Sequence, residues 1–192
     1  MFVLIAGLLL FLGVHSIRIF ADDWRSRTIE KIGEKTWKGL YSFNSLIGLV
    51  LIVWGYGLAR DYPALVWEPP LWTRHLTVAL MAGALFLVAQ NRNPQGPVSA
   101  WLGHPMMAGI AVWAFAHLMA NGTLADIILF GSFFAWSVLG YIAATKRDRE
   151  SGTIRQPAGW TADLGPGIAG IVLWLVFIWI AHEWLFGVAP LA

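Results

Sequence analysis

Apolar residues fill long stretches of this chain, and short polar connections separate the stretches. A helix needs about 20 mainly apolar residues to cross the hydrocarbon core of a bilayer. The apolar residues are continuous and do not alternate with polar ones, which favours helices over strands. The pattern predicts an all-α, polytopic transmembrane helix bundle with about six spans in a single domain, residues 1–192. The predicted spans are Met1–Phe20, Tyr41–Ala59, Trp72–Gln90, His104–Ala120, Thr123–Thr145 and Gly167–Gly187.

The first stretch resembles a signal peptide only in its length. It has no basic residue at its start and no clear small-residue cleavage site, and five further spans follow it. We therefore expect it to be a helix of the mature protein.

Composition excludes several classes of protein. Of the 192 residues, 58% are hydrophobic and 12% are charged, whereas soluble domains have about 25% charged residues. Cysteine is absent from the sequence, which excludes disulfides, iron–sulfur clusters and thiolate-bound metals. A formal net charge of +2 is too small to indicate a nucleic-acid partner. The partner that composition does indicate is the lipid bilayer.

Basic residues concentrate in alternate connections. The positive-inside rule therefore places the first, third and fifth connections in the cytoplasm and both termini outside it. Two basic residues, Arg60 and Arg74, lie on the opposite side, and Arg18 lies at the inner end of the first span. The remaining ten of the thirteen are Arg25, Arg27, Lys31, Lys35, Lys38, Arg92, Lys146, Arg147, Arg149 and Arg155.

Two connections have a pattern of their own. Charged residues at helical spacing between Glu30 and Lys38 predict a short helix lying along the cytoplasmic surface of the membrane. The segment Asn91–Gly103 contains Pro94, Gly96 and Pro97, which predict an irregular loop that re-enters the interface.

Polar residues within the spans carry the functional signal, because ionisable groups in a bilayer are costly. All five histidines lie in or at the edge of spans: His15, His75, His104, His117 and His182. In a chain without cysteine, imidazole is the strong transition-metal ligand that remains, and two histidines in a helix bundle can hold a heme iron. No histidine pair has the i,i+4 spacing of a compact zinc site.

Several motifs of the chain resemble the NnrU family of bacterial inner-membrane proteins, in the same order and spacing. These motifs are Leu12–Arg18, Gly33–Glu34, Trp37–Ser42, Gly103–Met107 and Trp113–Gly122. The resemblance implies a multi-pass protein of the bacterial inner membrane. It also implies a link to nitric oxide metabolism in denitrification, with denitrification or respiratory membrane proteins as partners.

A relative that shares this domain, the zeta-carotene isomerase of plants and cyanobacteria, binds heme b through two histidines. On this resemblance His15 and His117 would be the axial ligands, and His104 would be an auxiliary site residue. Gly103 stands where the isomerase motif has arginine. No histidine near Gly57–Arg60 matches a second isomerase motif, which argues against carotene as the substrate.

Depth in the membrane leaves other ligand pairs open. His15 lies about 9 Å from the inner end of its predicted span, and His117 about 20 Å from the inner end of the fourth. If span boundaries or heme tilt do not close this gap, depth favours His15 with His104, or His117 with His75 or His182.

Three hypotheses follow. The first is a heme b protein, linked to nitric oxide metabolism, that acts as a redox sensor or as an isomerase-like enzyme on a hydrophobic molecule. Loss of one iron ligand would open a position for nitric oxide or for that substrate. The second is a methyltransferase-like membrane enzyme without heme, suggested by the His104-Pro105 turn, Gly109 and the charged segment Lys146–Glu150. The third is a non-enzymatic assembly or regulatory partner of a nitric oxide reductase, in which the histidines bridge helices.

Overall fold

A computed structural model of the chain describes residues 1–90 and 96–191. The fold divides into two compact units, and each is described here by itself. Unit 1 comprises Met1–Trp67 and Thr123–Ser132, and unit 2 comprises Glu68–Gly122 and Phe133–Ala192. The described residues are helical apart from connections and one isolated bridge between Leu65 and Thr123.

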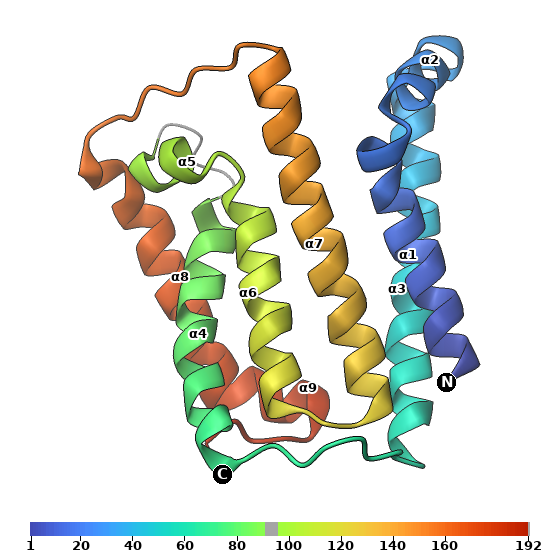
Figure 1. Cartoon of the computed structure of the whole chain (residues 1–192), viewed down its shortest axis with the longest axis vertical. Coiled ribbons are helices and arrows are strands. Elements are labelled where there is room, and N and C mark those ends of the chain that lie inside the picture. The colour runs from blue at the N-terminus through green and yellow to red at the C-terminus, as the bar shows by residue number, and fades with distance from the viewer. Residues whose placement is uncertain (91–95, 192) are drawn as a thin grey trace. The chain divides into compact units, whose positions relative to one another are not determined.

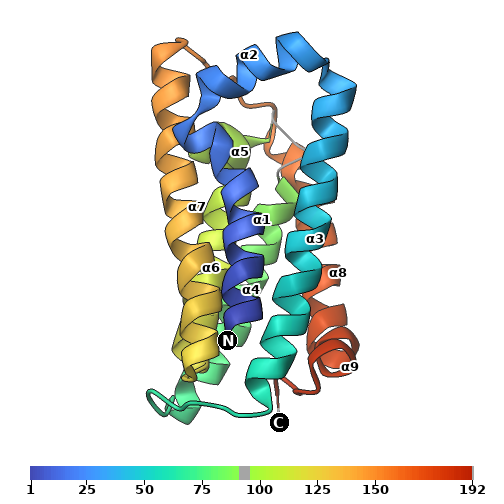
Figure 2. The same ribbon diagram turned by 90° about the vertical axis from the view of Figure 1, so that its right-hand side faces the viewer.

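Unit 1 is built on a pair of helices. Helix α1 (Phe2–Phe20) leads into α2 (Asp22–Ile32), which crosses to the start of α3 (Glu34–Arg60), as Figure 2 shows. The first turns of α7 (Leu124–Glu150) complete the unit.

Glycine allows α1 and α3 to approach closely. A Cβ atom at Gly7 would lie 2.6 Å from the Ile52 backbone nitrogen, and one at Gly48 would lie 2.8 Å from the Phe11 backbone nitrogen. Helices in lipid have no hydrophobic force that draws them together, and they associate largely through van der Waals packing. Small residues such as these glycines permit that packing because they let the two backbones approach closely.

Unit 2 places α4 between two other helices (Figure 1). A Cβ atom at Gly109 of α6 would lie 2.8 Å from the Ala84 carbonyl oxygen, and one at Gly170 of α8 would lie 2.7 Å from Phe86 Cα. Both contacts fall on the last turns of α4. The elements of this unit are α4 (Leu71–Ala89), α5 (Pro97–Leu102), α6 (Pro105–Ala120), the 3₁₀ turn Trp160–Asp163, α8 (Leu164–Val176), the π-helical turn Phe177–Ala181, α9 (His182–Phe186) and the rest of α7.

Five helices of the described chain are long and apolar enough to cross a membrane: Phe2–Phe20, Glu34–Arg60, Leu71–Ala89, Leu124–Glu150 and the continuous segment Trp160–Phe186. The structure thus confirms the polytopic helical fold. The fourth predicted span corresponds to α6, which is apolar but has only 16 residues. Its length is about 24 Å, which is less than the hydrocarbon thickness.

Two connections differ from the prediction. The helix expected across Glu30–Lys38 is divided at Gly33, which has φ +83°, so that Lys38 pairs with Glu34 in the first turns of α3. The segment expected to be an irregular loop contains the helix α5, with Pro97 in its first turn. Arg92 and Pro94 of that prediction lie outside the described residues.

In each unit, a hydrogen bond joins two connections that are two apart along the chain. In unit 1 the second connection meets the fourth, where the Leu124 N–H donates to the Ala64 carbonyl at 2.8 Å. In unit 2 the third meets the fifth, where the Val98 N–H donates to Asp163 Oδ2 at 3.0 Å. In an up-and-down order of helices, successive connections lie at opposite ends, so connections that are two apart share an end. The orientation of the termini stays a prediction.

Candidate functional site

His15 lies on α1 in unit 1, among aromatic side chains. Its Nδ1–H donates to the Phe11 carbonyl at 2.6 Å, and the two rings stack with their centroids 4.2 Å apart. The Tyr41 ring of α3 lies 5.0 Å from the imidazole. The side chain is half-buried, so the imidazole has a fixed orientation beside the α1–α3 contact.

His117 lies in the last turn of α6, in unit 2, and has the same local arrangement. Its Nδ1–H donates to the Trp113 carbonyl at 2.9 Å, and the Trp113 ring lies 5.4 Å from the imidazole. Trp113 itself packs edge-on against Phe133. An aromatic residue four positions earlier therefore orients each of the two histidines.

The shared hydrogen bond determines the tautomer of both rings. A carbonyl oxygen can only accept, so Nδ1 carries the hydrogen in each case, and a neutral ring has its lone pair on Nε2. Metal-binding histidines typically donate their other N–H to a carbonyl or carboxylate, which fixes ring orientation and raises ligand basicity. The donor chemistry of both rings would therefore fit ligands to a heme iron.

The predicted site histidines are divided between the two units. His15 belongs to unit 1, whereas His104 and His117 belong to unit 2. His104 precedes the first residue of α6 and His117 lies in its last turn, about 20 Å along the axis. Within residues 1–90 and 96–191, no three His, Asp or Glu side chains form a metal-binding cluster.

The other two histidines lie in unit 2. His75 is exposed on α4. The Nδ1–H of His182 donates to the Val188 carbonyl at 2.7 Å, directly after the π-helical turn. Both remain alternative partners for His117.

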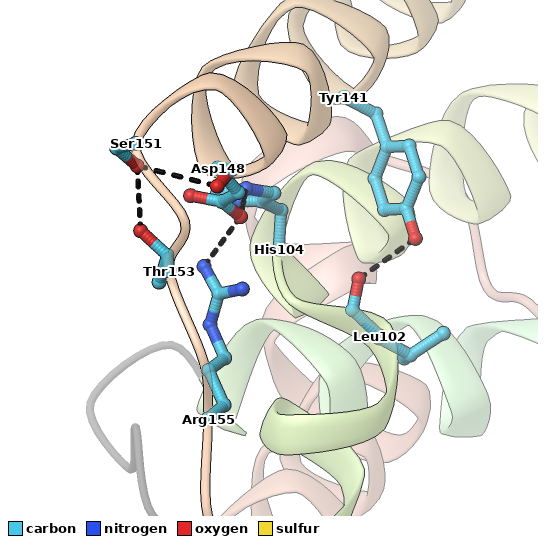
Figure 3. Close-up of polar contacts among 7 residues, drawn as sticks. All are labelled: Leu102, His104, Tyr141, Asp148, Ser151, Thr153 and Arg155. Atoms are coloured by element: carbon cyan, nitrogen blue, oxygen red, sulfur yellow. Dashed lines mark hydrogen bonds and ion pairs between the residues drawn. The ribbon is translucent and has the colours of Figure 1, made fainter.

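A second site forms around His104 at the other end of α6. His104 Nε2–H and Arg155 Nη2–H both donate to Asp148 Oδ2, each at 2.7 Å (Figure 3). Because arginine is permanently charged, the Asp148–Arg155 contact is a charge-assisted hydrogen bond. The carboxylate thereby joins the turn before α6, the end of α7 and the segment that follows α7.

Backbone hydrogen bonds hold the same region in place. The Thr153 N–H donates to the Asp148 carbonyl at 2.9 Å, which closes a turn around Gly152 at φ +65°. The Tyr141 hydroxyl donates to the Leu102 carbonyl at 2.7 Å and so fixes α5 against α7 (Figure 3). Gly103, at φ +76°, links α5 to His104.

These elements enclose an open hollow of about 440 Å³, within the size range of small-molecule sites. Its lining comes from α5, from the last turns of α7 and from the segment that follows. The residues are Ala100, Trp101, Leu102, Gly103, Tyr141, Thr145, Asp148, Arg149, Gly152, Thr153, Ile154 and Arg155. His104 and the charged segment Lys146–Glu150 are both evident in the sequence, but the contact between His104 and Asp148 is not.

A third polar cluster, in unit 1, has a structural role. The Asp126 side chain is only 5% exposed. It accepts hydrogen bonds from the Tyr56 hydroxyl at 2.5 Å and from the Thr123 N–H and hydroxyl at 3.0 and 2.6 Å. Together these bonds cap the start of α7 and join it to α3. Tyr56 lies 70 positions before Asp126 in the sequence, so no sequence spacing indicates this contact.

Comparison with known proteins shows the family. The sequence model of the NnrU family, described as NnrU protein, matches residues 3–190. The chain belongs to the NnrU family. No curated protein and no solved structure matches it. The match covers both units of this NnrU family member, including His15, His104 and His117, and confirms the family resemblance seen in the sequence.

Proposed function

We propose that this NnrU family member is a heme b protein of the bacterial inner membrane, in which His15 and His117 would hold the iron. One observation carries the proposal: both imidazoles donate through Nδ1 to the carbonyl of an aromatic residue four positions earlier. In each ring this bond leaves the Nε2 lone pair available to a metal. In a chain without cysteine, two such histidines would be suitable ligands of a heme iron.

The surroundings of the two rings fit the same role. Phe11 and Tyr41 contact His15, and Trp113 contacts His117. Aromatic side chains provide an apolar boundary that limits water access, which is one of the means by which a protein tunes a bound iron. The helix backbone fixes each ring, so neither imidazole needs to reorient for binding.

A bound heme would supply an iron that exchanges electrons and takes up nitric oxide when one ligand leaves. The protein's contribution would be to orient the two imidazoles and to keep the site apolar. We propose that this arrangement acts in nitric oxide or denitrification metabolism, as a redox sensor or as an isomerase-like enzyme on a hydrophobic molecule. Denitrification or respiratory membrane proteins would be its partners.

Absorption spectra test the proposal. The protein is purified in detergent after expression with a heme precursor, and oxidised and dithionite-reduced spectra are recorded for wild type, His15→Ala and His117→Ala. We expect a Soret band with sharp reduced α and β bands in wild type. Each of the two variants should lose these bands or most of the bound heme.

His75→Ala and His182→Ala are the matched controls, since both histidines lie within the same family match and neither belongs to the ligand pair proposed first. They should retain the wild-type spectrum. Loss of the bands in His75→Ala or His182→Ala, with His15→Ala unchanged, would assign the iron to a ligand pair within unit 2. A colourless wild-type protein with normal helix content would contradict heme binding altogether.

A further inference from the structure

We propose that the hollow beside α5 and the end of α7 binds the phosphate group of an anionic phospholipid. This site is separate from the two proposed heme ligands, and the proposal does not depend on heme. The hollow has a volume of about 440 Å³, which is enough for a phosphoglycerol headgroup.

The charged residues that line the hollow favour an anionic ligand. Two arginines and one carboxylate line the hollow: Arg149, Arg155 and Asp148. The Asp148 carboxylate already accepts hydrogen bonds from Arg155 and His104. Arg149 makes no ion pair among the described residues, so the lining has an excess of positive charge. A guanidinium is well suited to phosphate because its planar N–H groups match two phosphate oxygens.

Two apolar side chains in the lining indicate that the phosphate belongs to a lipid. Trp101 and Ile154 line the same hollow, and they are 85% and 86% exposed. A large apolar side chain exposed to this extent is unfavourable in water but suits the membrane interface, where tryptophan is enriched. A cationic hollow lined by two such side chains therefore fits an amphiphile better than a free ion.

The position of the hollow along α7 agrees with this source. The 27 residues of α7 span about 40 Å, which is more than the hydrocarbon core of about 30 Å. Its apolar part ends near Thr145, and the charged residues Lys146–Glu150 follow. The hollow lies at this change from apolar to charged residues, which is the level of lipid headgroups.

Gly103 shapes the floor of the hollow. A Cβ atom at this position would lie 3.3 Å from Arg155 Nη1, and the backbone has φ +76°. A side chain there would therefore both strain the backbone and push against the guanidinium. Glycine allows Arg155 to reach Asp148 while the hollow stays open.

Native mass spectrometry of the whole chain, released from detergent, tests the proposal. The protein is incubated with an equimolar mixture of phosphatidylglycerol and phosphatidylcholine, and in separate samples with sn-glycerol 3-phosphate or with inorganic phosphate. Wild type should retain phosphatidylglycerol at least fivefold over phosphatidylcholine. It should not retain either soluble phosphate at the same concentration.

Arg149→Gln is the test variant and Lys146→Gln is its matched control. Both remove one positive charge from the last turns of α7, but Lys146 is outside the hollow, where it pairs with Glu150. Arg149 is exposed, so its substitution should leave folding intact. We expect Arg149→Gln to lower phosphatidylglycerol retention by about tenfold, as for the loss of one charge-assisted hydrogen bond to phosphate, and Lys146→Gln to have little effect.

Three results would overturn the proposal. Equal losses in both variants would mean that diffuse surface charge retains the lipid. Equal retention of phosphatidylcholine would mean that the hollow does not recognise negative charge. Retention of glycerol phosphate or inorganic phosphate as strong as that of the lipid would assign the site to a soluble phosphate compound.

Discussion

The Gly48→Ala substitution tests the close packing of α1 against α3 that positions His15. A Cβ atom at Gly48 would lie 2.8 Å from the Phe11 nitrogen and 2.9 Å from its Cα, whereas ordinary contacts begin at 3.4 Å. The helices would have to separate by at least about 0.6 Å, because the opposing atoms belong to the backbone. Overpacking of this kind costs roughly 1–3 kcal/mol of unfolding free energy. The displacement would also move Phe11, whose carbonyl accepts the His15 hydrogen bond.

Gly57→Ala is the matched control on the same helix, since a Cβ atom there has no neighbour within 4 Å. It should be neutral or stabilising by up to about 1 kcal/mol, because alanine is the better helix former. Unfolding is followed in detergent by circular dichroism during titration with dodecyl sulfate. The reasoning would be refuted if Gly48→Ala unfolded at the same dodecyl sulfate fraction as Gly57→Ala.

Three further predictions concern the polar clusters. Tyr56→Phe removes a hydrogen bond to the buried Asp126 carboxylate and should cost about 1.5–3 kcal/mol in the same titration. An unchanged midpoint would contradict a stabilising link between α3 and α7. Asp148→Asn weakens the contact that holds Arg155, so limited trypsin digestion should cleave after Arg155 several times faster than in wild type, and an equal rate would argue against it. Gly103→Ala places a side chain at φ +76° and should cost about 1–3 kcal/mol, which a thermal melt would detect. A Tm equal to that of wild type would show that the strain is absent.

Apolar runs made the helices predictable, but their charged ends were not predictable from hydrophobicity. The second predicted span began at Tyr41, whereas α3 begins at Glu34. The fifth ended at Thr145, whereas α7 continues to Glu150. In both cases oppositely charged residues four apart, such as Lys38 with Glu34 and Lys146 with Glu150, support the helix beyond its apolar part.

Backbone conformation explains the two connections that were predicted wrongly. The charge spacing between Glu30 and Lys38 fits one helix, but Gly33 adopts a positive φ and separates α2 from α3. The proline and glycine residues before His104 indicated a loop, yet Pro97 occupies the first turn of α5. Proline is well tolerated at that position, because the first N–H groups of a helix have no partner within it.

The candidate site was predictable only as far as single residues. Membrane histidines are rare enough that His15, His104 and His117 could be selected from the sequence. The Asp148 partner of His104 is 44 positions away, and no spacing rule connects residues so distant. Gly48 and Gly55 on α3 offered a signal that was not used, since small residues seven apart lie on one helix face.

The most direct test of the heme proposal is electron paramagnetic resonance of the oxidised, purified protein. Two axial imidazoles should give a low-spin ferric signal in wild type and in His75→Ala. His15→Ala and His117→Ala should each convert it to a high-spin signal or lose it with the heme. A low-spin signal unchanged in either of these variants would contradict ligation by that histidine, and a wild-type protein without any ferric heme signal would contradict the central proposal.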